Sequence, residues 1–154
     1  MSLEGDIELL GRVPLFSDLT PDSLHLLAFN SVRRDLVAGE ILFSKDDSAT
    51  SGFVVAYGVI ELATGLGGQG GVRQRCNRGS LIGEVPLFVD TKRPADARAT
   101  TVSTVMEISR QIMLRMLQEY PDTALSLHTK MATRLDKTIV DLNGVKRSLL
   151  AIDG

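Results

Sequence analysis

The sequence of 154 residues is poor in the side chains from which disulfides and metal sites are built. It has one cysteine, Cys76, and two histidines, His25 and His128, which lie far apart in the chain. A lone cysteine excludes an intrachain disulfide and a cysteine-based zinc site, and two distant histidines argue against a cupin-type metal site. Since 44% of the residues are hydrophobic, we expect a fold held together by its apolar core, with no metal and no required cofactor.

Long apolar runs and an excess of basic charge are also missing. No run approaches the ~18 residues that span a bilayer. The N-terminus has neither the basic start nor the apolar stretch of a signal peptide, so we expect a cytoplasmic protein without a membrane partner. The 17 Lys and Arg residues are outnumbered by 19 Asp and Glu residues, which gives a net charge of −2. Because nucleic-acid-binding surfaces need excess positive charge, we expect no nucleic acid partner for this chain.

Catalytic constellations are absent from the sequence pattern. We find no Ser/His/Asp or Cys/His set that suits nucleophilic catalysis, and no pair of carboxylates placed for acid–base chemistry. We therefore expect a binding protein that is not an enzyme.

Tryptophan is absent too, whereas 14 glycines and five prolines indicate many turns and hence β structure. Between residues 32 and 109, short apolar runs alternate with turn signals such as Tyr57-Gly58 and Arg78-Gly79. The expected strands cover residues 41–43, 53–56, 59–62, 81–82, 97–101 and 105–108. Many short strands of this kind predict an antiparallel sandwich or a jelly-roll barrel.

Helical patterns flank this β region. Residues 7–10 and 15–29 have helical periodicity. Thr20-Pro21-Asp22 is a typical helix start, since Thr20 can cap the helix and Pro21 suits its first position. After residue 108 the period is helical again, first over residues 112–118 and then from residue 122 to about residue 152.

The last of these helices carries apolar positions at alternating spacings of four and three residues, which is a heptad seam. The seam consists of Met131, Leu135, Thr138, Leu142, Val145 and Leu149. A helix of ~30 residues at ~1.5 Å each reaches ~45 Å, which is more than a compact body of this size needs. We therefore predict a homodimer formed through residues 122–152. The alternative is an ordinary helix packed along its own domain.

One segment, residues 79–98, combines residue types that suit a nucleotide. Glu84 can accept hydrogen bonds from ribose hydroxyls. Gly83 allows close backbone approach at the start of a short helix, where free amides favour an anion. Arg93 presents a planar guanidinium that suits a phosphate. Together, within a jelly-roll, these three residues indicate a nucleotide site.

The chain resembles a cyclic nucleotide-binding domain, in particular the effector domain of the catabolite activator and its Crp/Fnr relatives. Residues 13–19 (VPLFSDL) resemble the opening helix and turn of that family, residues 38–43 (AGEILF) its first barrel strand, and residues 57–60 (YGVI) its glycine-containing hairpin. Ile82-Gly83-Glu84 and Arg93 match the phosphate-binding cassette, which is the most specific motif of the family. Residues 131–135 (MATRL) resemble the dimer helix.

This resemblance implies a mainly β fold with flanking helices: a jelly-roll, or double-stranded β-helix, with a long C-terminal helix. It divides the chain into an N-terminal helical segment over residues 1–31, a β-roll over residues 32–109 and C-terminal helices, including the dimer helix, over residues 110–154. The cassette at residues 79–98 belongs to the β-roll.

The resemblance also implies a ligand, cAMP or cGMP. Glu84 would hold the ribose 2′-hydroxyl and Arg93 the cyclic phosphate, while Arg134 and Thr138 would face the purine. The implied ligand-binding residues are Ile82, Gly83, Glu84, Val85, Arg93, Pro94, Ala95, Arg134 and Thr138.

Three residues depart from the family pattern. Pro94 stands where an Ala, Ser or Thr usually supplies a backbone amide to the phosphate, and losing one such bond costs ~1.5–3 kcal/mol, roughly ten- to a hundredfold in affinity. Asp96 replaces a Ser or Thr; on an extended segment it shares a face with Pro94, where it weakens phosphate binding or pairs with Arg93. Asp46 replaces a turn glycine.

Three functions remain open at this point. The first is a regulatory sensor domain that binds a cyclic nucleotide weakly and responds through a population shift that repositions the long helix. The second is a degenerate, non-binding module for dimerisation or other interactions. The third is the effector half of a transcription regulator without its DNA-binding half, because the chain stops where Crp/Fnr relatives begin their helix-turn-helix.

Overall fold

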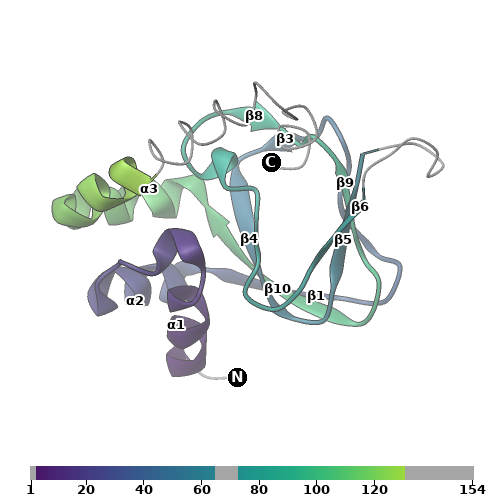
Figure 1. Ribbon diagram of the computed structural model, residues 1–154, viewed down its shortest axis with the longest axis horizontal. Helices are drawn as coiled ribbons and strands as arrows, with labels where there is room; N and C mark the ends of the chain where they lie inside the picture. The colour runs from purple at the N-terminus through teal and green to yellow at the C-terminus, as the bar shows by residue number, and fades with distance from the viewer. Residues whose placement is uncertain (1–2, 65–72, 131–154) are drawn as a thin grey trace.

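Helices pack against one end of a β-roll in the computed structural model, which describes residues 3–64 and 73–130 (Figure 1). The described helical elements are α1 (Leu3–Gly11), η1 (Pro14–Phe16), α2 (Pro21–Asn30), η3 (Val85–Leu87), α3 (Arg110–Glu119) and the helical residues 121–130. Thr20 caps α2 as predicted, since its hydroxyl accepts a hydrogen bond from the Ser23 amide at 3.2 Å. None of the described helices is both long and apolar enough to cross a membrane.

Antiparallel pairing of short strands forms the roll. The strands are β1 (Val32–Leu36), β2 (Ile41–Phe43), β3 (Ser48–Ala49), β4 (Ser51–Tyr57), β5 (Ile60–Ala63), β6 (Arg73–Cys76), β7 (Leu81–Ile82), β8 (Thr91–Lys92), β9 (Asp96–Ala99) and β10 (Ser103–Ser109). One four-stranded sheet has the order β1-β10-β4-β7, a second has the order β2-β9-β5-β6, and β3 pairs with β8. The predicted jelly-roll class is confirmed.

Four of these strands, β1, β3, β6 and β8, were not among the strands expected from apolar runs. β3 and β8 have only two residues each. The two longer ones are β1 and β6. Their sequences, VRRDL and RQRC, are dominated by charged and polar residues. Both lie at the edge of their sheet. Charged side chains are usual on edge strands, where they oppose pairing with other chains, so an apolar run cannot reveal such strands.

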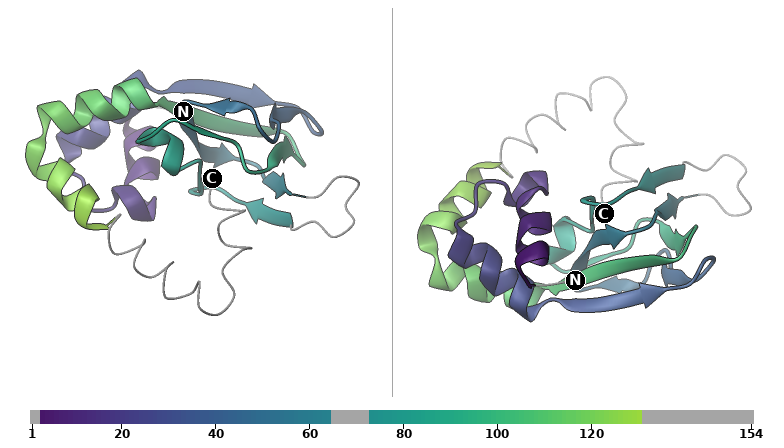
Figure 2. Two further views of the ribbon diagram at one scale, coloured as in Figure 1. Left: turned by 90° about the horizontal axis from the view of Figure 1, so that it is seen from above. Right: turned by 90° about the horizontal axis from the view of Figure 1, so that it is seen from below.

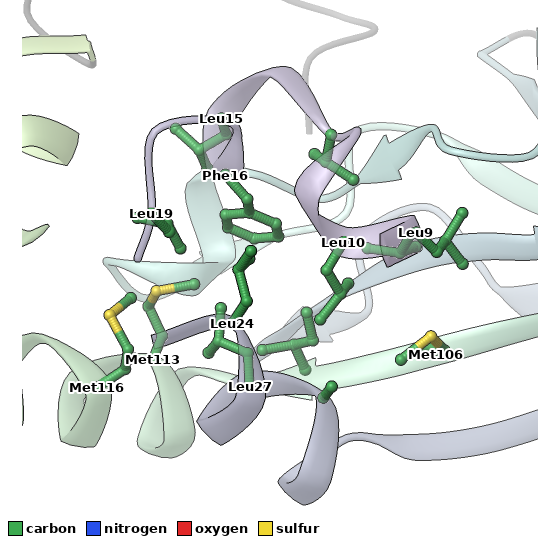
Figure 3. Packing of buried hydrophobic residues seen from close by; sticks show 14 of the residues in the cluster. Leu9, Leu10, Leu15, Phe16, Leu19, Leu24, Leu27, Met106, Met113 and Met116 are labelled. Atoms are coloured by element: carbon green, nitrogen blue, oxygen red, sulfur yellow. The ribbon is translucent and has the colours of Figure 1, made fainter. Parts of the chain in front are cut away.

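The sheet that contains β4 separates two apolar clusters. Val54 and Ala56 of β4 face the cluster between this sheet and the helices, whereas Phe53 and Val55 face the interior of the roll. Successive side chains of β4 point to opposite faces of the sheet, and an apolar cluster covers each face, so β4 is buried on both. Figure 3 shows the helix-side cluster, which includes Leu9, Leu10, Phe16, Leu24, Leu27, Met106, Met113 and Met116. The second cluster lines the interior of the roll, which holds the predicted site.

The C-terminal helices begin where the periodicity predicts them. Ser109 caps α3 by accepting a hydrogen bond from the Ile112 amide at 3.2 Å. Figure 2 shows α3 beside α1 and α2 at the same end of the roll. Lys130 then donates from Nζ to the Pro14 carbonyl at 2.8 Å and to Ser17 Oγ at 2.9 Å. The heptad seam from Met131 onward lies outside the described residues.

The turn before β3 holds Asp46 in a left-handed conformation with φ of 72°. Its amide donates to the Arg93 carbonyl at 2.8 Å, so the turn packs directly against the cassette. A residue with a Cβ in this left-handed conformation destabilises the folded state by roughly 1–2 kcal/mol relative to glycine. Glycine recovers only part of this energy, because it loses more backbone entropy when the chain folds.

We therefore expect Asp46→Gly to raise the free energy of unfolding by about 0.5–1 kcal/mol in urea denaturation. The matched control is Asp47→Gly, because Asp47 Oδ2 accepts a hydrogen bond from the Ser44 amide at 2.9 Å and glycine removes that bond. Asp47→Gly should lower stability. A loss of stability in Asp46→Gly would contradict the prediction.

Candidate functional site

Arg93 follows β8 and is the only charged residue that is buried among those the structure describes, with 4% of its surface exposed. Its backbone is fixed on both sides: the Arg93 amide donates to the Asp47 carbonyl at 2.9 Å, and the Arg93 carbonyl accepts from the Asp46 amide. The guanidinium carbon lies 4.4 Å from the centre of the Phe43 ring and 5.3 Å from that of Phe53. The cation therefore lies in the interior of the roll, against two aromatic rings.

The hydrogen bonds of the guanidinium are incomplete. Nη2 donates to the Ser51 carbonyl at 2.9 Å and lies 3.4 Å from Ser51 Oγ. Nη1 is buried and has no hydrogen-bond partner within the described part of the chain. Burial lowers the pKa of Arg93, and the carboxylates of Glu107 and Asp47 partly offset that effect. An arginine still keeps its charge at neutral pH, so this is a buried cation with unused donor capacity.

Gly83 lies directly beside this unpaired nitrogen. A Cβ at position 83 would be 2.6 Å from Arg93 Nη1, and the backbone of Gly83 has φ of 86°. Gly52 completes the close packing, because a Cβ there would be 2.8 Å from the Gly83 carbonyl oxygen. The pairing of Ile82 with Phe53, between β7 and β4, brings these segments together. Only glycine suits position 83, both for its backbone conformation and for the space beside the guanidinium.

The residues around Gly83 differ in their exposure. Ile82 is buried in the interior cluster, and Val85 is exposed at the start of η3. Glu84 is half-buried and precedes η3, where its carbonyl accepts from the Leu87 amide at 3.1 Å. The structure thus brings Gly83 to Arg93, with Ile82 and Glu84 on either side of Gly83 along the chain.

The segment after Arg93 differs from the expectation. Residues 94 and 95 form a bend, so Pro94 and Asp96 do not belong to one extended strand. Asp96 Oδ1 accepts from the Lys45 amide at 2.7 Å. No ion pair within residues 3–64 and 73–130 joins Arg93 to Asp96. The pairing considered from sequence is therefore wrong: Asp96 stabilises a neighbouring turn and leaves the guanidinium available. Ala95 is buried and Pro94 half-buried.

Sequence reasoning missed the residues behind the guanidinium. Ser51 Oγ donates to Glu107 Oε2 at 2.7 Å, and Glu107 Oε1 lies 3.8 Å from Arg34 Nη1. The Arg34 guanidinium carbon in turn lies 5.7 Å from the centre of the Phe53 ring. One signal was present: Glu107 shares the inward face of β10 with the fully buried Val105, and a carboxylate on such a face needs a polar partner. Arg134 and Thr138 lie outside the described residues.

The sequence pattern of the cyclic nucleotide-binding domain family matches residues 33–120, more than half of the chain. The chain belongs to this family. The predicted resemblance is confirmed, and the matched span includes every described residue of the site.

Known relatives agree with this assignment. The chain is 27% identical to the HTH-type transcriptional regulator Cmr of Mycobacterium tuberculosis over 88% of this chain and 54% of the relative. The solved structure of a cyclic nucleotide-binding-like protein from Brucella abortus is 38% identical with a TM-score of 0.66, covering 73% of this chain and 97% of that one. The structure of the Thermus thermophilus catabolite activator protein is 29% identical with a TM-score of 0.70, and the match covers 84% of this chain and 62% of that one. This chain therefore spans about half the length of Cmr.

Proposed function

We propose that this cyclic nucleotide-binding domain is a regulatory sensor that binds cAMP or cGMP with its cyclic phosphate on Arg93. The observation that carries the proposal is the buried Nη1 of Arg93, which has no hydrogen-bond partner in the described chain. A buried donor without a partner is costly, and an anionic oxygen beside Gly83 would satisfy it. Glu84, next to Gly83, is the proposed partner of the ribose 2′-hydroxyl.

The surroundings of Arg93 suit a single negative charge. Phe43 and Phe53 cover the guanidinium and exclude water, which strengthens its attraction for an anion. Nη2 is held by Ser51, so the guanidinium plane is fixed before the ligand arrives. Such preorganisation reduces the entropy lost on binding. The remaining proposed contacts are Ile82, Val85 and Ala95, with Arg134 and Thr138 at the purine.

Weak binding follows from Pro94. Asp96 is occupied by the Lys45 amide, so of the two departures near the phosphate only the missing amide of Pro94 directly removes a phosphate contact. A degenerate module that binds no nucleotide is the second candidate, and Pro94 is the observation that favours it. For both candidates, the sensor and the non-binding module, we also propose a homodimer through residues 122–152. We further propose a role as the effector half of a transcription regulator.

The distinguishing experiment is isothermal titration calorimetry of the unaltered protein with cAMP, cGMP and the non-cyclic control 5′-AMP. We expect saturable binding of a cyclic nucleotide with a Kd between about 1 μM and 1 mM, and weaker binding of 5′-AMP. The absence of cyclic-nucleotide binding at millimolar concentration would reject the sensor and leave the non-binding module.

A further inference from the structure

Arg110, the first residue of α3, reaches back from its helix to the loop between Glu84 and Arg93. Its Nε donates to the Pro86 carbonyl at 2.9 Å, and its Nη2 donates to the Val89 carbonyl at 3.0 Å. Nη1 forms an ion pair with Asp90. A single side chain therefore bonds to three residues of the cassette loop. Figure 1 shows β10 running directly into α3, which places this arginine at the junction of roll and helix.

The same side chain also contacts the strand beside the loop. Nη2 donates to the Ala49 carbonyl at 3.0 Å, and Ala49 belongs to β3, which pairs with β8 just before Arg93. The backbone amide of Arg110 donates to the Thr50 carbonyl at 2.9 Å. The Arg110 side chain is largely buried, with 18% of its surface exposed, whereas 92% of Asp90 is exposed. Because Asp90 is exposed to solvent, the ion pair contributes little to holding the loop. The hydrogen bonds from Arg110 to backbone carbonyls are the contacts that fix the position of the loop.

The first half of the loop is anchored in the helix-side core, because Leu87 is fully buried there and Phe88 packs against the same cluster. The second half, with Val89 and Asp90 exposed, has no such anchor in the core of the described chain. The regular structure of the loop consists of the three residues of η3 and the two-residue ladder of β8 with β3. The carbonyls of Pro86 and Val89 receive their donors from Arg110, and only a planar guanidinium offers donors in several directions from one position. Lysine at this position would keep the charge and lose this geometry.

We propose that Arg110 is the positioning residue of the nucleotide site: it holds the loop so that Gly83 and Arg93 keep the spacing that receives the phosphate. The proposal rests on the proposed function, because the spacing matters for binding only if a phosphate occupies it. Since Arg110 begins α3, the same bonds couple the site to the C-terminal helices. By linkage, a change in α3 that loosens Arg110 lowers nucleotide affinity, and nucleotide binding strengthens the attachment of α3 to the loop.

The test compares Arg110→Met with Arg115→Met, a matched control on the same helix. Arg115 is exposed and pairs with Glu119, four residues on in the same helix, at 3.1 Å. Calorimetric titration with cAMP and cGMP is done at a temperature where thermal unfolding curves show both variants folded. We expect at least a tenfold weaker affinity in Arg110→Met, no rescue by Arg110→Lys, and an affinity within twofold of the unaltered protein in Arg115→Met.

Amide hydrogen exchange of the ligand-free proteins provides the second readout. We expect faster exchange over residues 85–92 in Arg110→Met than in Arg115→Met. Unchanged affinity in a folded Arg110→Met would overturn the proposal, as would rescue by lysine. If the unaltered protein binds no cyclic nucleotide, the proposed function fails. Faster exchange in Arg110→Met would then show that Arg110 stabilises the loop without a role in binding. Unchanged exchange would show that Arg110 does not stabilise the loop either.

Discussion

Arg93→Met is expected to weaken cyclic-nucleotide affinity by about a hundredfold or more, because the phosphate loses charge-assisted hydrogen bonds worth about 1.5–3 kcal/mol each. Methionine fills much of the same space between Phe43 and Phe53, so the pocket keeps its walls. The loss should appear in calorimetric titration with whichever of cAMP and cGMP the unaltered protein binds.

The stability of this variant separates a binding role from a structural one. Methionine removes the donor to the Ser51 carbonyl, but it also removes a desolvated cation whose Nη1 lacks a partner in the described chain. We expect these effects to offset each other to within about 1 kcal/mol in the free energy of unfolding without ligand.

The matched control for Arg93→Met is Arg98→Met in β9. The Arg98 side chain is half exposed and lies 3.8 Å from Glu61, outside the site. Its replacement should leave affinity unchanged. Collapse of the fold in Arg93→Met, or equal affinity losses in the two variants, would contradict the assignment of Arg93 to the phosphate.

Pro94→Ser is expected to strengthen the same binding by ten- to a hundredfold. Serine restores the backbone amide next to Arg93, and one hydrogen bond to a charged phosphate contributes about 1.5–3 kcal/mol. Pro94→Ala separates the contributions, because it restores the amide without adding a hydroxyl. We expect alanine to recover most of the gain.

The control for Pro94→Ser is Pro121→Ala, which removes a proline ring from an exposed helix start away from the site. It should leave affinity unchanged. Tight binding of cAMP by the unaltered protein, or equal affinities before and after Pro94→Ser, would show that the amide at this position does not limit binding.

The sequence predicted those parts of the fold in which local pattern and burial agree. Apolar runs revealed β4 and β10, because both are central strands with buried side chains on both faces. The charged edge strands β1 and β6 escaped, because their positions are set by pairing with distant segments and not by a local apolar pattern.

The site was predictable to a similar extent. Gly83 and Arg93 could be found from a short motif, because the cassette is nearly continuous in sequence. Ser51 could not, and Glu107 gave only the signal of a carboxylate on a buried strand face, since the 2.7 Å hydrogen bond between them joins residues 56 positions apart through the pairing of β4 with β10. The contact of Asp96 with the Lys45 amide is equally non-local, and it changes the electrostatic interpretation of the cassette.

The most direct test of the phosphate assignment is a crystal structure of the unaltered protein with cAMP or cGMP. We expect a cyclic phosphate oxygen at about 3 Å from Arg93 Nη1, beside the Gly83 backbone, with the Ser51 bond to Nη2 retained. A nucleotide bound with its phosphate elsewhere, while Nη1 of Arg93 bonds to a protein oxygen, would contradict the assignment.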